Sequence, residues 1–99
     1  MPTLEDFRKD IDRVDEVIVR LLNERARVAC EIGRLKKAEG VPVYQPEREK
    51  QVIEHVRSVA NEGPLGPEAI VRLFERIIDE ARRLERRVVH GEETPDRLT

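Results

Sequence analysis

The fold is decided by residues 4–38, which read LEDFRKDIDRVDEVIVRLLNERARVACEIGRLKKA. Apolar residues recur along this stretch at alternating spacings of three and four, which keeps them on one face of a helix for about nine turns. This apolar stripe consists of Leu4, Phe7, Ile11, Val14, Ile18, Leu21, Val28, Ile32 and Leu35. The pattern predicts one uninterrupted helix, with Thr3 as a suitable N-cap and with Gly40 and Pro42 at its end.

The predicted helix is too long for a compact single chain. At a rise of 1.5 Å per residue it spans roughly 50 Å, whereas a compact chain of this size has a radius of gyration of about 13 Å. The 99 residues include two Phe, one Tyr and no Trp, so the core is small and aliphatic. One chain cannot cover the apolar stripe. We therefore expect a partner helix, most simply from a second copy in a homodimer.

Two shorter helices follow. Pro46 suits the first position of one, whose inward face contains Val52, Ile53, Val56 and Ala60. The run 61–67, rich in glycine and proline, ends it, and Pro67 begins a third helix. The third helix carries a predicted apolar seam of Ile70, Phe74, Ile77, Ala81, Leu84 and Val88. No strand pattern occurs, so the sequence predicts an all-α fold with one helical domain over residues 1–90 and a disordered tail over 91–99.

Composition excludes several classes of function. Nineteen basic and 21 acidic residues give a net charge of −2, so no overall field attracts nucleic acid or an anionic membrane. There is no apolar run near the ~20 residues needed to span a bilayer, and the charged N-terminus does not resemble a signal peptide. The single Cys30 fits a reducing compartment and is interpreted as a small apolar filler. His55 and His90 are too isolated to predict a metal site. We expect a soluble, cytoplasmic protein.

Several charged residues interrupt or flank the apolar faces. The spacing of the stripe predicts a hydrophobic residue at position 25, but this position is occupied by Arg25. Lys36 follows eleven residues later on the same face, roughly 16 Å further along the axis, so both side chains can converge on a small anion. Arg48 and Glu49 lie in the first turn of the second helix, where free backbone N–H groups also favour an anion. Glu85 lies at the edge of the third helix's apolar face.

Arg8 provides a geometric test of this anion site. Along an unbroken helix it lies about 25 Å from Arg25 and 42 Å from Lys36, which exceeds the size of a small metabolite. If Arg8 contributes to the same pocket, it must therefore come from the other subunit of a dimer.

Each of these charges also has an ordinary structural interpretation. Arg8, Arg48 and Glu49 could be solvated surface charges, and Lys36 could pair with the helix C-terminus. Arg25 could form a buried ion pair or fix the register of a coiled coil. Glu85 could pair with neighbouring arginines on its own helix. Spacing alone therefore predicts no more than a helical dimer with a cationic internal pocket.

The order of motifs resembles that of the all-α chorismate mutases over roughly residues 4–87. The chain has an arginine just before an I-D-x-x-D segment, then E-R, G-x-x-K and P-x-R-E. The resemblance implies an intertwined homodimer of three-helix chains, with two active sites that each use both subunits. It also implies a cofactor-free and metal-free Claisen rearrangement of chorismate to prephenate, on the route to phenylalanine and tyrosine.

The resemblance assigns roles to eight positions. Arg25 and Arg48 would bind the substrate carboxylates, and Arg8 would do so across the dimer interface. Lys36 would contact a carboxylate and the ether oxygen of the breaking C–O bond, with Glu85 as the second donor to that oxygen. Further substrate contacts fall on Glu49, which would accept the C4 hydroxyl, and on Gln45 and Ala81. Many relatives have Asp at position 45 and some have Ser at position 81, so these two departures bear on affinity more than on activity.

Two alternatives remain open at this point. An isochorismate pyruvate-lyase would share the fold, Lys36 and the arginines, although Glu85 disfavours it because that relative has Gln there. A non-catalytic or regulatory helical subunit could instead dock on a larger shikimate-pathway enzyme.

Overall fold

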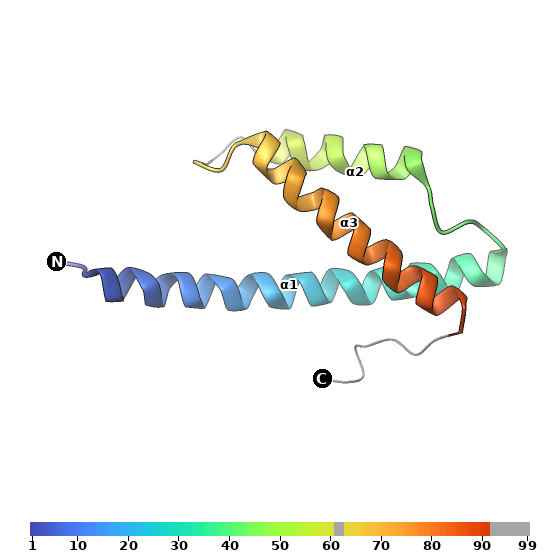
Figure 1. Cartoon of the computed structure of the whole chain (residues 1–99), viewed down its shortest axis with the longest axis horizontal. Coiled ribbons are helices and arrows are strands. Elements are labelled where there is room, and N and C mark those ends of the chain that lie inside the picture. Colours follow the sequence, from blue (N-terminus) through green and yellow to red (C-terminus); the bar gives the residue numbers. More distant parts are fainter. Residues whose placement is uncertain (61–62, 92–99) are drawn as a thin grey trace.

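The computed structural model describes residues 1–60 and 63–91 as three helices in chain order: α1 (Leu4–Glu39), α2 (Pro46–Val59) and α3 (Pro67–Val89) (Figure 1). These described residues contain no strand, so the predicted all-α class is confirmed. None of the described helices has an apolar stretch long enough to cross a membrane. Most of the predicted tail, residues 92–99, and Asn61 and Glu62 of the predicted linker lie outside the described residues.

The helix ends form where the sequence predicts them. Thr3 Oγ1 accepts a hydrogen bond from Asp6 N, and the Asp6 carboxylate accepts one from Thr3 N, which satisfies two backbone donors at the start of α1. Gly40 ends α1 in the left-handed conformation, with φ of 70°. Pro46 and Pro67 occupy the first positions of α2 and α3. The predicted end of α1 at residue 38 is one residue short.

The three helices meet at only one end of α1. α3 crosses the C-terminal half of α1 and α2 packs on α3, while the N-terminal half of α1 extends away from both (Figure 1). At the crossing, a Cβ atom added to Gly33 would lie 3.1 Å from Glu85 Cα and 3.2 Å from Val88 Cβ. A side chain at position 33 would therefore push α3 away from α1. Gly33 fixes the close approach that brings Glu85 beside α1.

The buried apolar core of one chain is small, and its α3 face differs from the predicted seam. Ala29, Cys30, Val56, Val71, Ile78 and Val88 are the buried apolar residues among those described. Of the predicted seam only Val88 is buried, and the other five residues are half-buried. The prediction of that seam is therefore wrong, because the buried face of α3 is displaced from it by about one residue around the helix. Because α1 and α2 contact α3 from two directions, the covered line runs through Val71, Ile78 and Glu85 instead.

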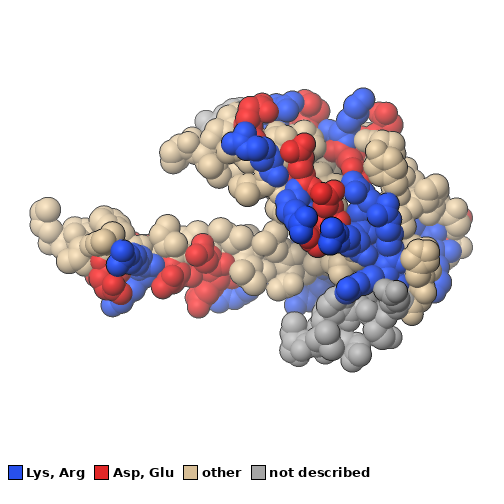
Figure 2. All heavy atoms as spheres, in the orientation of Figure 1, with Lys and Arg blue, Asp and Glu red and all other residues tan. Residues whose placement is uncertain are grey.

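The apolar stripe of α1 is exposed in the single chain. Leu4, Ile11 and Leu21 are 64%, 59% and 57% exposed. Figure 2 shows the charged atoms of the N-terminal half of α1 along one edge, with uncharged atoms along the edge on the side of α2 and α3. The radius of gyration is 16.6 Å, against about 13 Å for a compact chain of this length. An apolar strip this long needs a cover that no described part of the chain supplies.

Candidate active site

A cavity of about 430 Å³ lies where the C-terminal half of α1, the start of α2 and the C-terminal half of α3 come together. Seven of the eight predicted site residues line it: Arg25, Lys36, Gln45, Arg48, Glu49, Ala81 and Glu85. Apolar side chains from α1, α2 and α3, including Ile32, Val52 and Ile78, form the wall between them. A volume of this size and mixed lining suit a small, charged organic molecule.

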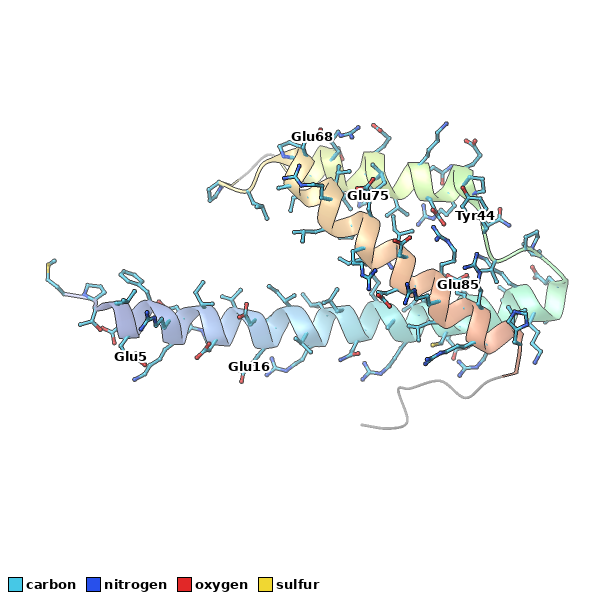
Figure 3. All side chains as sticks on the ribbon, viewed as in Figure 1. Glu5, Glu16, Tyr44, Glu68, Glu75 and Glu85 are labelled. Carbon is cyan, nitrogen blue, oxygen red and sulfur yellow. The ribbon has the colours of Figure 1, made fainter. Side chains whose placement is uncertain are left out.

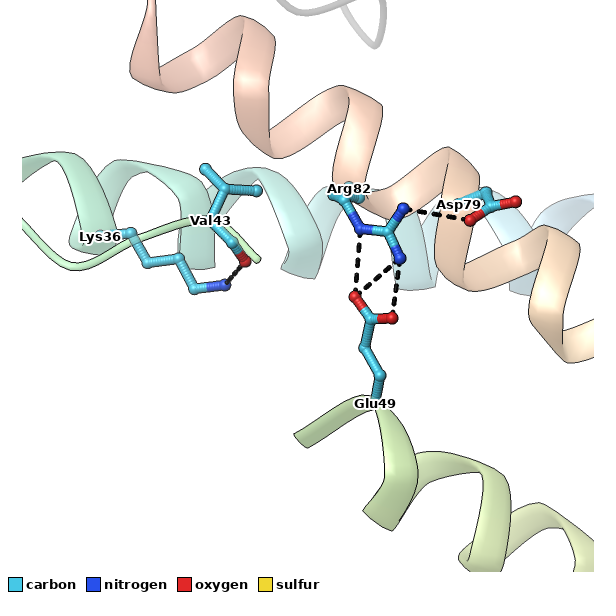
Figure 4. A network of polar contacts seen from close by, with 5 residues as sticks. All are labelled: Lys36, Val43, Glu49, Asp79 and Arg82. Carbon is cyan, nitrogen blue, oxygen red and sulfur yellow. Dashed lines mark hydrogen bonds and ion pairs between the residues drawn. The ribbon is translucent and has the colours of Figure 1, made fainter. Parts of the chain in front are cut away.

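Lys36 and Glu85 form an ion pair in this cavity. Lys36 Nζ donates one hydrogen bond to Glu85 Oε1, at 2.7 Å. It donates another to the Val43 carbonyl oxygen, at 2.8 Å (Figure 4). The Lys36 and Glu85 side chains are 17% and 12% exposed, and Figure 3 shows Glu85 on α3 at the point where α3 crosses α1. Glu85 is therefore not a surface partner of arginines on its own helix, and the ion pair fixes both side chains at one end of the cavity.

The guanidinium groups of Arg25 and Arg48 have no carboxylate partner among the described residues. Arg25 is half-buried and forms no hydrogen bond or ion pair with any described residue, so it is not part of a buried ion pair within this chain. Arg48 is exposed and makes a single long hydrogen bond of 3.4 Å to Gln51 Oε1. Arg82 also lines the cavity. Because the guanidinium groups of Arg25 and Arg48 are not paired with any carboxylate of the described residues, the site favours an anionic ligand.

Glu49 is held by a residue that sequence reasoning missed. Arg82 of α3 donates to both Glu49 oxygens, with Nη2 at 2.7 Å from Oε1 and at 2.8 Å from Oε2 (Figure 4). This hydrogen bond raises the pKa of Arg82 despite its partial desolvation. The interpretation of Glu49 as a solvated surface charge is therefore wrong. Spacing from Ile78 could have found Arg82, because residues 78, 82 and 85 share one face of a helix.

The remaining predicted residues are placed as follows. Gln45 Nε2 donates to the Pro42 carbonyl oxygen at 3.0 Å, so its amide N–H is used within the loop before α2. Ala81 lines the cavity without a polar atom in its side chain. Arg8 is exposed near the start of α1 and does not line the cavity of its own chain. Among the described residues, no three His, Cys, Asp or Glu side chains gather in a way that could hold a metal ion.

Comparison with known proteins identifies the family. The sequence profile of the chorismate mutase type II family matches residues 7–86, and the chain belongs to this family. A bifunctional chorismate mutase/prephenate dehydratase from Aquifex aeolicus is 40% identical in an alignment 91 residues long that covers 89% of this chain and 25% of that protein. The chain thus spans about a quarter of the length of these bifunctional relatives.

Relatives of similar length also match. A chorismate mutase from Methanocaldococcus jannaschii is 29% identical over 94 residues, which cover 95% of this chain and 93% of that one. The solved structure of a chorismate mutase (form II) from Thermus thermophilus superposes with a TM-score of 0.81 at 38% identity, covering 91% of this chain and 98% of that one. The family and the three-helix fold inferred from the motifs are therefore confirmed.

Proposed function

We propose that this chain converts chorismate to prephenate, a step of phenylalanine and tyrosine biosynthesis. The observation that carries the proposal is the single cavity in which Arg25, Lys36, Arg48, Glu49 and Glu85 lie together although they come from three helices. The Methanocaldococcus and Thermus relatives, which are named chorismate mutases and match nearly the whole chain, support it.

The charges of the cavity suit the substrate. Chorismate carries two carboxylates, and its reactive conformer folds the enolpyruvyl arm over the ring, which brings negative groups together at an electrostatic cost. The planar guanidinium groups of Arg25 and Arg48 can each bind a carboxylate through two hydrogen bonds and so favour that conformer. Glu49, next to Arg48 at the start of α2, would accept the C4 hydroxyl. Binding therefore selects the geometry from which the reaction proceeds.

Lys36 supplies the main stabilisation of the transition state. As the C–O bond lengthens, negative charge grows on the ether oxygen, and the Lys36 ammonium can donate to it within a largely apolar cavity. The bonds of Lys36 to Glu85 and Val43 hold the ammonium in place before the substrate arrives. The rearrangement is intramolecular, so the reaction needs no nucleophile or general base from the protein.

Glu85→Gln tests the donor role of Glu85. In the ion pair the Glu85 carboxylate accepts a hydrogen bond from Lys36, whereas an amide at this position can donate one to the ether oxygen. We expect Glu85→Gln to retain turnover of chorismate, and initial rates for both proteins measure this. Loss of turnover in folded Glu85→Gln would refute the donor role.

We further propose that the functional unit is a homodimer in which Arg8 enters the partner's cavity. The exposed apolar stripe of α1 supports this, since a second α1 is of the right length and chemistry to cover it. Along α1, Arg8 and Lys36 are separated by 28 residues, or about 42 Å, so one chain cannot bring both to one ligand.

Substitution of the stripe tests the dimer. Ile18 is 48% exposed in one chain, and Ile18→Glu places a charge where the partner helix is expected. Because burial of an unpaired charge is costly, we expect the dimer dissociation constant to rise by a factor of about 10³ or more. Analytical ultracentrifugation measures this. Arg20→Glu, on the polar face, is the control, and it should remain dimeric although it changes the charge by twice as much.

The activity is tested by adding the pure protein to chorismate and, separately, to isochorismate. Loss of chorismate with formation of prephenate, measured by NMR, supports the proposal. Release of pyruvate from isochorismate alone would assign the chain to the lyase reaction. No turnover of either substrate would favour the non-catalytic subunit.

We propose that the dimer works in the cytoplasm. A larger shikimate-pathway enzyme is a candidate partner, because relatives named bifunctional chorismate mutase/prephenate dehydratase contain a similar segment within a longer chain. Turnover measured with and without such an enzyme tests the partnership.

A further inference from the structure

Arg82 connects α3 to α2 and to the loop before α2. It lies on α3, and its guanidinium forms a two-pronged contact with Glu49 of α2, with a third bond from Nε to Oε2 at 3.1 Å. The same guanidinium lies 5.3 Å from the centroid of the Tyr44 ring in the loop before α2. Asp79, one turn earlier on α3, accepts a further bond from Nη1 at 3.2 Å. Glu49 is thus oriented by a fixed, planar donor.

The pair also separates two hollows. A second hollow of about 620 Å³ is lined in part by Tyr44, Glu75 and Asp79, and Glu49 and Arg82 line both it and the main cavity. The Glu49 and Arg82 side chains are 27% and 21% exposed, so their ion pair is partly desolvated and stronger than a surface pair. Loss of the guanidinium would leave a carboxylate facing the main cavity without its principal counter-charge.

We propose that Arg82 is a positioning residue, which orients the Glu49 carboxylate and neutralises its charge so that Glu49 can accept a hydrogen bond from a dianionic substrate. The inference rests on the proposed function. A carboxylate is a good hydrogen-bond acceptor for the substrate hydroxyl. Without a counter-charge, however, it repels a ligand with two negative charges. Arg82 meets both requirements, because its positive charge offsets that of Glu49 while its N–H groups occupy one side of the carboxylate and leave lone pairs directed elsewhere.

The test compares KM and kcat for chorismate in Arg82→Met, Glu49→Gln and the double variant. We expect Arg82→Met to raise KM by about tenfold or more with a smaller change in kcat, because the uncompensated Glu49 charge weakens substrate binding throughout the reaction. In the double variant the neutral amide removes that repulsion. Its KM is therefore expected to return to within about threefold of the wild-type value. Two substitutions with independent effects would not give this recovery.

Arg57→Met is the matched control. Arg57 also joins α2 to α3, through an ion pair with Glu68 at 3.4 Å, but it lines neither hollow. We expect this variant to lower the melting temperature while kcat and KM stay at wild-type values. If Arg82→Met lowered only the melting temperature, as Arg57→Met does, the role of Arg82 would be structural and the proposal would be overturned.

Three further outcomes keep the test decisive. A double variant with a higher KM than Arg82→Met would show that Arg82 and Glu49 act separately on the substrate, against the proposal. If Arg82→Met does not fold, Arg82→Lys replaces it; this variant keeps the charge but not the planar fork, and we expect kcat/KM to fall about three- to tenfold. Arg82→Lys with the kinetics of Arg57→Met would contradict the proposal. Absence of turnover by the wild-type protein would instead refute the proposed function itself.

Discussion

Lys36→Ala is expected to lower kcat/KM for chorismate by a factor of about 10³, equivalent to about 4 kcal/mol of transition-state stabilisation. Lys36 lines the cavity, is 17% exposed and is held by hydrogen bonds to Glu85 and Val43, so its ammonium is in place before the C–O bond begins to break. Initial rates over a range of chorismate concentrations measure the loss. Most of it should appear in kcat, because the interaction strengthens as charge develops.

Lys37→Ala is the control for this substitution. Lys37 is the next residue of α1, is exposed and does not line the cavity, so its removal should leave kcat/KM within about twofold of wild type. Because Lys36→Ala leaves Glu85 without its partner, the double variant Lys36→Ala/Glu85→Gln separates loss of stability from loss of catalysis. Near-wild-type rates in folded Lys36→Ala would contradict the proposed mechanism.

The second large effect is a gain of activity on mixing two inactive variants. Arg8→Ala and Lys36→Ala each damage every active site in their own homodimers. If Arg8 acts across the interface, a heterodimer of the two has one fully intact site, with Lys36 from one chain and Arg8 from the other. A one-to-one mixture that is unfolded and refolded together contains about half heterodimers, so its activity should reach about one quarter of the wild-type value.

The alternative arrangement gives the opposite result. If Arg8 served the cavity of its own chain, both sites of the heterodimer would carry a damaged residue, and refolding the mixture would restore nothing. Refolding each variant alone under the same conditions is the control. Activity that stays at the level of these controls would remove Arg8 from the partner's site.

Local signals in the sequence predict most of the fold. Thr3, Gly40, Pro46 and Pro67 define helix ends through chemistry that acts within one turn, so the helix bounds agree closely with the structure. The seven cavity residues were found because their charges stand out against apolar faces or because they match family motifs. These residues line one cavity because the three helices pack together. The sequence pattern indicates this packing but does not give its geometry.

The features that were missed depend on the orientation of whole helices. The buried line of α3 runs through Val71 and Ile78 because α1 and α2 approach from two sides, and no periodicity within α3 carries that information. Arg82 was overlooked for the same reason. In a sequence with 40% charged residues, only its spacing from Ile78 and Glu85 distinguishes this arginine, and the packing of α2 against α3 places it opposite Glu49.

Gly33 has a consequence for how this fold can change over evolution or by design. The gap between Lys36 and Glu85 is set by one backbone lying against another, a dimension that side-chain choice elsewhere cannot restore. Residues around the cavity can be exchanged to suit a different ligand, but the spacing of Lys36 and Glu85, the two proposed donors to the ether oxygen, is inherited as a single unit. New specificities on this fold should therefore arise from substitutions around Arg25 and Arg48, while the crossing of α1 and α3 at Gly33 stays unaltered.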